Sequence, residues 1–477
     1  MNQVIHIKDI SAEFRTLSDR LRTRIAGREH TGARDEAGPD NAALASQLDR
    51  VEARLEDLQN HLDYVRHVSE STRATEAMLA RRKVPVGPVK VLFLVHHPEA
   101  WYSLAAVHSL MESDPSFSVT VASVPRHFPG STTFKDEESV DERLNHFHVK
   151  HVRFHNRDPF LDLNTVRMLD PDIIFRQSQW DGDVPNAFGT WEIRFSRLCL
   201  VPYEIMNLVH NIPEDDGLNT AVDSEFHRSA WAIFCANEAV KDIAAVESPS
   251  NAAEQYVVTG HPKADLLRSI DSSATHEPGH RYTVLWSAHH SIGTEWIGFG
   301  TFPESAPVMI DAARRHPEWD FVFSAHPALL THLSHPEPPL TPELVDDFYA
   351  QWDALPNTSI FGGGDYAEVF GRSDVLISDG LSWIMEFQLT GKPVVFIERA
   401  GHREFNQMGL AVVRGTNVVP DTPGGIRAIE GLAAGGADSQ REGQRALDQL
   451  IGGHGDAAQR ILESIKSKLV VEGWQPV

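Results

Sequence analysis

Short, almost purely apolar runs recur along this chain, and a polar loop follows each of them. The first is Val89–Val95, VKVLFLV, which precedes a helix-like stretch at 102–112 and a second apolar run at 117–122. Comparable runs lie within 170–178, 198–204, 231–237 and 255–267. Strands that are covered on both faces read as continuous apolar runs, whereas half-exposed strands alternate. The pattern therefore predicts βαβ units that build a parallel sheet.

The pattern stops and then starts again in the second half of the chain. Residues 269–280 are polar and contain Gly and Pro, as expected of a linker. Apolar runs then resume at Tyr282–Ser287 and within 319–327, 358–363, 374–378 and 392–397. Two successive α/β series of this size predict two facing Rossmann-like domains with a cleft between them. We expect these domains at 88–268 and 281–430, with terminal helices at 431–477.

Residues 1–85 have a helical periodicity instead. An apolar stripe with alternating steps of four and three runs through Leu44, Leu48, Val51, Leu55, Leu58, Leu62 and Val65. Most positions between these residues are polar or charged. Such a narrow stripe predicts a coiled coil that joins copies of the chain into a homo-oligomer. The alternative is a helix that packs on its own domain.

Composition excludes several classes of function. The net charge of −24 argues against a nucleic-acid partner, because phosphate backbones require clustered Lys and Arg. Cys199 and Cys235 fit inert core positions in a reducing compartment. No signal-peptide pattern and no long apolar run occurs, so we expect a cytoplasmic protein. The 25 histidines are scattered without an HExxH or paired CxxC motif, and we expect no metal site.

The segment from Ser373 to Ile397 predicts a phosphate site. A strand ends at Ser378, Asp379 and Gly380 make a turn, and a helix begins near Ser382. We expect Asp379 and Gly380 to be among the donor-binding residues. The free N–H groups and the positive end of a helix favour a diphosphate at such a place. Ser382 would add a hydroxyl donor, and Glu386, one turn later, would accept from ribose hydroxyls. The alternative is that Asp379 or Ser382 only caps the helix.

Histidines follow three other predicted strands. His326 ends the strand in 319–327, and a histidine there can donate to phosphate oxygens or move a proton. His289 and His290 follow the strand that ends at Ser287, and we count Ser287 and His289 with the donor-binding residues. His96 and His97 occupy the matching place in the N-terminal domain and are candidates to line the acceptor side. Adjacent histidines rarely converge on one metal ion, and no carboxylate partner lies nearby in the sequence.

Two further segments carry candidate residues. In 201–219, His210, Asp215 and Asp216 are candidates for the general base that deprotonates an acceptor hydroxyl, although a solvated acidic loop reads the same way. In GHPKAD, 260–265, Lys263 is a candidate phosphate contact or a residue that caps the last helix of its domain.

Five motifs, taken in order, resemble the CDP-glycerol glycerophosphotransferase family of teichoic acid and capsule synthesis. The family's TGxPRxD, APTxR, RxHP, SDxLITDYSSxxFD and KPxxFY correspond to TGHPKAD, WSAHHS, FSAHP, SDVLISDGLSWIMEF and KPVVFI. Gly380 and Leu381 replace the family's Tyr-Ser, and LVHNIP, with His210, is the nearest counterpart of its WHGTP segment. The resemblance implies a metal-independent GT-B fold that holds the CDP group on the C-terminal domain. It also implies that His326 and Ser382 contact the donor phosphates.

The resemblance implies transfer of glycerol phosphate, or a related alditol phosphate, from a CDP-activated donor to an acceptor hydroxyl. The acceptor would be a polymer or a lipid-linked precursor at the inner face of the membrane, and no cofactor besides the donor substrate is expected. One alternative is a GT-B glycosyltransferase that uses a nucleotide sugar for surface polysaccharide. Two others are a nucleotide-sugar epimerase and a non-catalytic scaffold that works through its coiled coil.

Overall fold

The computed structural model describes residues 54–476 and divides the chain into two compact units, 1–79 and 80–477. Within 54–476 the gaps are 55–57, 59–60, 63, 67, 74, 82, 127–135, 211–220, 249–252, 272–274, 276–277, 294–296, 327, 330–339, 363–364 and 453–454. The described residues between 54 and 81 are helical. The stripe residues Leu58, Leu62 and Val65 are exposed on this helix, whereas the earlier part of the stripe lies outside the described residues. The coiled coil stays a prediction.

The N-terminal domain is built on a seven-stranded parallel sheet in the order β3-β2-β1-β4-β5-β6-β7. Its strands are β1 (Val89–Val95), β2 (Phe117–Ser123), β3 (Val152–Arg153), β4 (Ile173–Arg176), β5 (Arg197–Leu200), β6 (Ala230–Cys235) and β7 (Tyr256–Val258). β1 pairs with β2 on one side and β4 on the other, and all its residues except Lys90 are buried. This central position explains its unbroken apolar sequence.

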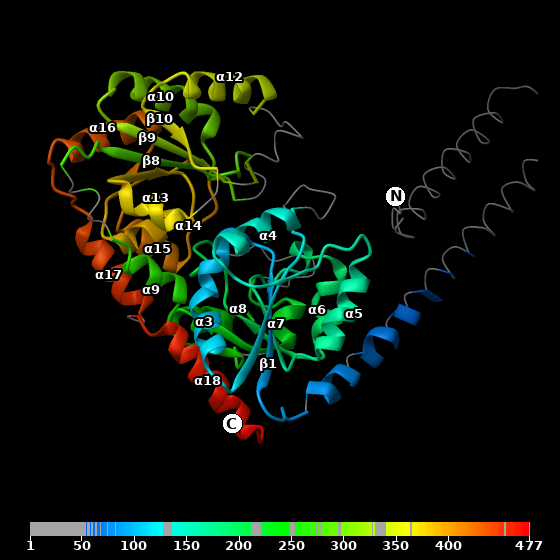
Figure 1. Cartoon of the computed structure of the whole chain (residues 1–477). Helices are drawn as coiled ribbons and strands as arrows, with labels where there is room; N and C mark the ends of the chain where they lie inside the picture. Colours follow the sequence, from blue (N-terminus) through cyan, green and yellow to red (C-terminus); the bar gives the residue numbers. More distant parts are fainter. Residues whose placement is uncertain are drawn as a thin grey trace, which may run out of the picture. The chain divides into compact units, whose positions relative to one another are not determined.

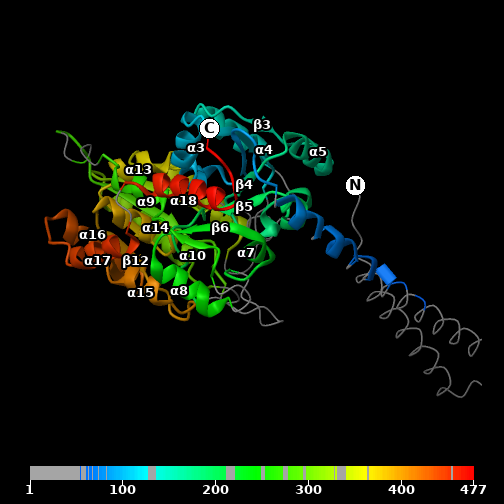
Figure 2. The same cartoon turned by 90° about the horizontal axis from the view of Figure 1, so that it is seen from below.

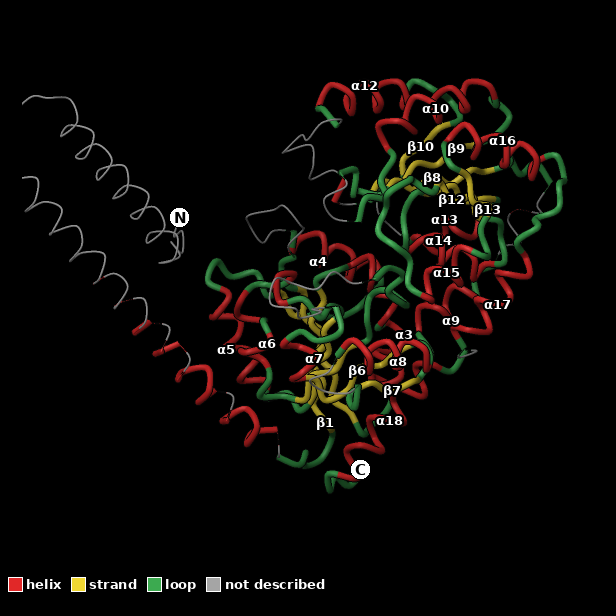
Figure 3. The backbone as a smooth tube through the Cα atoms, turned by 180° about the vertical axis from the view of Figure 1, so that it is seen from behind, coloured by secondary structure: helices red, strands yellow, loops and turns green. Residues whose placement is uncertain are grey.

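Helices cover both faces of this sheet (Figure 3). They are α3 (Ala105–Ser113), α4 (Glu137–His146), α5 (Pro159–Leu169), α6 (Thr190–Ile193), α7 (Glu225–Ser229), α8 (Glu238–Glu247) and α9 (Pro262–Arg268), with 3-10 turns η1 (Pro98–Ser103), η2 (Asp181–Asp183) and η3 (Asn186–Phe188). The local sequence determines where several of these helices begin. Asp158 caps α5 and Asn237 caps α8 through their side-chain oxygens, and Pro159 and Pro262 occupy first-turn positions that suit proline.

The C-terminal domain repeats the arrangement with a six-stranded parallel sheet in the order β10-β9-β8-β11-β12-β13. Its strands are β8 (Thr283–Ala288), β9 (Asp320–Ala325), β10 (Thr358–Ile360), β11 (Val375–Ser378), β12 (Val394–Ile397) and β13 (Asn417–Val419). Its helices are α10 (Phe302–Arg315), α12 (Pro342–Asp353), α13 (Tyr366–Arg372), α14 (Ser382–Glu386), α15 (Gln407–Val413) and α16 (Thr422–Ala433), with the 3-10 turn η5 (Phe387–Thr390) directly after α14.

The chain's last two helices connect the domains again. α17 (Arg441–Ile451) contacts α15 and η5 of the C-terminal domain, and α18 (Ala457–Val471) contacts α3 and α9 of the N-terminal domain (Figures 1 and 2). Ile461, Ile465 and Leu469 of α18 are fully buried in the core of the N-terminal domain. The tail is therefore part of both domains rather than a separate module.

The two domains share one apolar cluster. Ile205, Met206 and Leu208, which follow β5, pack with Phe405 and Met408 of the C-terminal domain. Hydrogen bonds add to the packing, because Val209 and Phe405 form an antiparallel bridge and the side-chain amide of Asn406 donates to the carbonyl oxygen of Asn207. This buried contact fixes the domains against each other on one side of the facing strand ends.

The two-domain α/β architecture expected from the sequence is confirmed, and its arrangement is that of the GT-B fold. The sequence analysis did not predict the two edge strands β3 and β13, because each is short and not fully apolar. In the part of the chain that the structure describes, no helix has the length and apolar character needed to cross a membrane.

Candidate functional site

The strand order selects one place in each sheet where a ligand would bind. In the N-terminal sheet β1 lies between β2 and β4, so the loops after β1 and β4 leave toward opposite faces. In the C-terminal sheet β8 lies between β9 and β11 in the same way. Open α/β sheets bind ligands beyond the carboxyl ends of the strands at such switch points. The candidate site therefore consists of the loops that follow β1, β4, β8 and β11.

Asp379, directly after β11, holds the loop that follows β8. Its Oδ1 accepts a hydrogen bond from the backbone N of His289 at 2.7 Å, and its Oδ2 accepts from the N and Oγ1 of Thr301 at 2.5 and 2.9 Å. Burial raises the pKa of Asp379 to about 6, against the lowering effect of these donors. No side chain caps α14, so the expected alternative of an Asp379 or Ser382 cap is wrong. Asp379 positions His289.

His289 and His326 present neutral N–H donors at this switch point. The Nδ1 of His289 accepts from the backbone N of Ser291, and the Nδ1 of His326 accepts from the N of Ala328, each at 3.1 Å. Each imidazole therefore carries its proton on Nε2. Burial lowers the pKa of His289 to about 3, and the protein atoms around His326 lower its pKa too. The two rings lie 5.5 Å apart, so the histidines after β8 and β9 are neighbours in space.

The turn into α14 lies beside these rings. A Cβ added at Gly380 would stand 3.4 Å from Cδ2 of His289, so the imidazole lies against this glycine. Ser382 is exposed at the start of α14, whereas Glu386, one turn later, is buried. Ser287 lies within β8, between Ser378 of β11 and Ser324 of β9, in a row of serines near the strand ends. His289 and Gly380 therefore lie in contact, and Ser382 follows Gly380 by two residues in the chain.

Lys263 and Glu386 form an ion pair that joins the two domains. The Nζ of Lys263 lies 2.5 Å from Oε1 of Glu386 and also donates to the carbonyl oxygen of Tyr203 at 3.0 Å. The side chains are 8% and 1% exposed. Burial raises the pKa of Glu386, and Lys263 opposes that rise. Glu386 was expected to accept from ribose and Lys263 to contact phosphate or cap a helix. In the structure the two charged groups pair with each other. His261, rather than Lys263, caps α9.

Glu204 is the acidic residue that sequence reasoning missed. It follows β5 in the segment VPYE, next to Tyr203, and is only partly exposed. Burial raises its pKa to about 7, while the charge of Lys263 lowers it and that of Glu386 raises it. A carboxyl with a pKa near neutrality can accept and return a proton at working pH. Its position directly after a buried strand was the available signal.

In the N-terminal domain, Gln177 after β4 holds the loop after β1. Its Oε1 accepts from the backbone N of His96 and of His97, both at 2.9 Å, and its Nε2 donates to the carbonyl oxygen of His97 at 3.0 Å. This is the counterpart of the Asp379 contact in the other domain. The two sides interact electrostatically, because the charges of Glu99 and His97 act on the pKa of His326. His96 and His97 thus lie at the switch point of the N-terminal sheet, and their role on the acceptor side stays a prediction.

The predicted bases after β5 have different outcomes. His210 is exposed, and its backbone N donates to the carbonyl oxygen of Glu404 at 2.9 Å, while its carbonyl oxygen accepts from Nε of Arg403 at 3.0 Å. The segment is thus held by the loop after β12. Asp215 and Asp216 lie outside the described residues. The assignment of these residues as bases stays a prediction.

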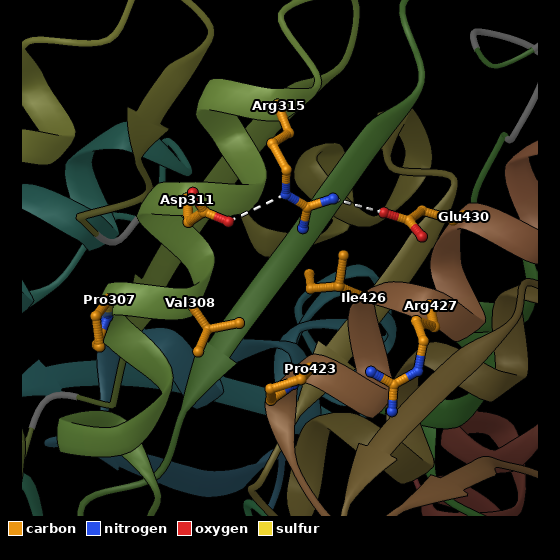
Figure 4. A pocket seen from close by; sticks show the side chains of 8 residues that line it. All are labelled: Pro307, Val308, Asp311, Arg315, Pro423, Ile426, Arg427 and Glu430. Carbon is orange, nitrogen blue, oxygen red and sulfur yellow. Dashed lines mark hydrogen bonds and ion pairs between the residues drawn. The ribbon is translucent and has the colours of Figure 1, made fainter.

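A separate surface groove lies between α10 and α16 (Figure 4). The guanidinium of Arg315 spans it, with Nε 3.0 Å from Oδ2 of Asp311 and Nη1 2.9 Å from Oε1 of Glu430. Pro307, Val308, Pro423 and Ile426 supply the apolar part of its lining. None of the candidate site residues lines this groove.

No protein-family model matches the chain, and neither does any curated protein sequence. Solved structures do match. UDP-GlcNAc 2-epimerase from Neisseria meningitidis, bound to UDP-GlcNAc, has a TM-score of 0.54 at 13% identity over 80% of this chain and 100% of its own. MnaA of S. aureus with UDP has a TM-score of 0.54 at 14% identity over 80% and 97%. The wall teichoic acid polymerase TagF has a TM-score of 0.52 at 12% identity over 88% and 99%. At such identities the likeness shows the fold.

Proposed function

We propose that this chain is a transferase that binds a nucleotide-activated donor beyond β8, β9 and β11 and moves its phosphoalditol group to an acceptor hydroxyl. The observation that most supports this proposal is the pair of neutral Nε2–H donors of His289 and His326. They lie near Gly380 and the exposed Ser382. The donor is glycerol phosphate, or a related alditol phosphate, activated as a CDP derivative. The order of motifs in the sequence and the fold shared with a teichoic acid polymerase support this choice.

The donors suit a diphosphate for a physical reason. Hydrogen bonds from N–H groups to an anionic oxygen are stronger than neutral ones, and a preorganised donor needs no rearrangement as charge develops. The hydrogen bonds that Nδ1 of His289 and Nδ1 of His326 accept from backbone N–H groups fix both rings. Each Nε2–H group therefore has a set direction. Ser382 adds a hydroxyl at the first residue of α14. Asp379 keeps the loop of His289 in place.

Glu204 supplies the base in this proposal. The acceptor hydroxyl loses its proton to Glu204 as its oxygen forms a bond to the β-phosphorus of the donor. The bond between that phosphorus and the bridging oxygen breaks, and CMP leaves with the bond's electron pair. His289, His326 and Ser382 donate to the phosphate oxygens as this charge develops. The acceptor is the terminal hydroxyl of a polymer or of a lipid-linked precursor.

Thermal unfolding with nucleotide donors tests the proposal. The full chain is heated with CDP-glycerol, CDP-ribitol, CMP-sugars or UDP-sugars, and a ligand at about 100 times its Kd adds roughly 2.7 kcal/mol of stability. We expect the CDP-alditols to raise Tm most. His326→Ala should weaken this effect, whereas His316→Ala, a histidine stacked on Trp319 away from the site, should leave it unchanged. A chain that no nucleotide stabilises would be the scaffold instead.

A nucleotide-sugar epimerase is the second candidate. The structural match with this chain extends over nearly the whole length of the epimerases. In addition, an acid–base group such as Glu204 could abstract a proton from a sugar as well as activate an acceptor hydroxyl. The two functions differ in their need for an acceptor. Incubation with UDP-GlcNAc alone, followed by chromatography of the sugar nucleotides, gives a second epimer only for the epimerase. CMP release that requires an added acceptor identifies the transferase.

We also propose that the helix around residues 54–81 joins copies of the chain through its apolar stripe. Leu58, Leu62 and Val65 are 55%, 46% and 61% exposed although they follow the coiled-coil spacing. Replacement of Leu58 and Leu62 by Asp in the full chain should convert the oligomer to a monomer in light scattering. The matched control replaces Arg66 and Arg73, off the stripe, by Gln. An oligomer that survives the Asp variants would contradict the coiled coil.

A further inference from the structure

Three side chains of the N-terminal domain converge beyond the ends of β1 and β4. His96 and His97 follow β1, and Asp183 belongs to η2 after β4. One ligand atom of each lies within 4.8 Å of the other two. Among the residues that the structure describes, this is the one group of three or more His, Cys or carboxylate side chains arranged in this way. It occupies the switch point of the sheet, where ligands bind in open α/β folds.

His96 provides a second, independent observation. Its side chain is 0% exposed, and neither Nδ1 nor Nε2 has a hydrogen-bond partner among the described residues. A buried polar group without a partner costs free energy, so native structures almost always satisfy it. A metal ion bound to one imidazole nitrogen would satisfy that nitrogen. Asp183 does not hydrogen-bond to the neighbouring His97 either, because its Oδ2 lies 3.6 Å from Nε2 of His97, beyond hydrogen-bonding distance.

The surroundings hold all three side chains in place. Gln177 fixes the backbone of both histidines. The hydroxyl of Ser178 donates to Oδ2 of Asp183 at 2.5 Å, the oxygen that lies 3.6 Å from Nε2 of His97, and so orients the carboxylate. Such outer contacts orient the ligands of metal sites. Two cations lie in the surroundings, Arg176 and Arg126. Each is paired with a carboxylate, Asp181 at 2.6 Å and Glu99 at 2.9 Å, which reduces the repulsion that it exerts on a bound ion.

We propose that His96, His97 and Asp183 bind one divalent transition-metal ion of the zinc type. Two imidazoles and one carboxylate suit zinc or a neighbouring first-row ion better than calcium or magnesium, which take oxygen ligands. Zinc–nitrogen bonds of about 2.0–2.1 Å place ligand atoms about 3.4 Å apart in a tetrahedral site. The three ligand atoms now lie within 4.8 Å of one another, so a bound ion would draw them closer together. Three protein ligands leave a fourth position for water or for an oxygen of the acceptor.

The sequence predicts no metal site because Asp183 lies 86 positions after His97 in the chain. Adjacent histidines alone rarely share an ion, and only the packing of β1 beside β4 brings the carboxylate to them. The inference does not depend on the proposed transferase activity, since it concerns an ion bound by the protein alone.

Metal titration of the full chain tests the site. The purified protein is stripped with a chelator, dialysed and titrated with Zn²⁺ or Co²⁺ without nucleotide. We expect one tightly bound ion per chain, with visible absorption from bound Co²⁺. Asp183→Asn and His97→Ala should each weaken binding by roughly tenfold or more. Asp141→Asn is the matched control, because it removes the carboxylate 2.8 Å from the single histidine His151 and should leave the affinity unchanged.

Two results would overturn the proposal. One is a wild-type chain that binds no ion stoichiometrically. The other is an ion that Asp183→Asn and His97→Ala bind as tightly as the wild type does, because the ion would then lie elsewhere. Thermal unfolding of the metal-free proteins shows that the variants are folded, so a loss of binding in a variant with wild-type Tm supports the site.

Discussion

Removal of one partner of the Lys263–Glu386 pair should be among the most destabilising changes in this protein. The two charges lie 2.5 Å apart, and their side chains are 8% and 1% exposed. Lys263→Met keeps the length of the side chain but leaves the Glu386 carboxylate buried without a cation. Breaking a buried pair in this way costs about 3–5 kcal/mol of unfolding free energy. Glu386→Leu should also be destabilising, because it removes the carboxylate that pairs with the Lys263 ammonium and leaves the Tyr203 carbonyl oxygen and the charge of Glu204 as its partners.

The double variant shows how much of the lost stability comes from leaving one charge buried without its partner. Lys263→Met with Glu386→Leu removes both charges, so it should lose only about 1 kcal/mol, mainly from the unpaired Tyr203 carbonyl. Urea unfolding followed by tryptophan fluorescence measures all three variants. Lys150→Met, at an exposed position, is the control and should change stability by no more than about 0.5 kcal/mol. Single variants that lose less than about 1 kcal/mol, or a double variant that loses the sum of both, would refute the buried-pair argument.

The pH dependence of Lys263→Met follows from the same contact. Burial raises the pKa of Glu386 above its usual range, and Lys263 holds the pKa down. Without the lysine the folded-state pKa rises further above the unfolded value. A raised carboxyl pKa means that folding is favoured while the group is protonated and disfavoured as pH rises through the folded pKa. The deficit of Lys263→Met should therefore be smallest in acid and largest at alkaline pH.

Three other changes test the site and the domain contact. Glu204→Gln should lower kcat about 10²–10⁴-fold and abolish the rise of kcat/KM through pH of about 7, which a pH–rate profile measures. Asp379→Asn should release the loop after β8, cost about 1–3 kcal/mol in urea unfolding and weaken donor binding in calorimetry. Gly409→Ala would place a Cβ 2.1 Å from the carbonyl oxygen of Leu208, so its Tm should fall, whereas Gly431→Ala, with open space in α16, should gain about 0.5–1 kcal/mol.

Much of the candidate site could be found from the sequence because strand ends are local features. An apolar run followed at once by polar residues marks both a buried strand and the loop at its carboxyl end. That logic selected His289, His326 and Gly380, which the structure brings together. The strand-end pattern could not distinguish a residue that contacts the ligand from one that holds a neighbouring loop in place. Asp379 was expected at the ligand, and its carboxylate turns inward to hold the loop of His289.

The sequence by itself determined the two parallel sheets, because unbroken apolar runs leave no other way to bury both faces of each strand. Long-range partners required the folded chain. Glu386 meets Lys263 from the other domain, 123 positions away, and Asp183 meets His96 and His97 across neighbouring strands. The tertiary structure also set the environment of Glu204, whose pKa depends on burial and on charges from both domains. Desolvation and Coulomb energies depend on distances in space, and sequence spacing carries no such distances.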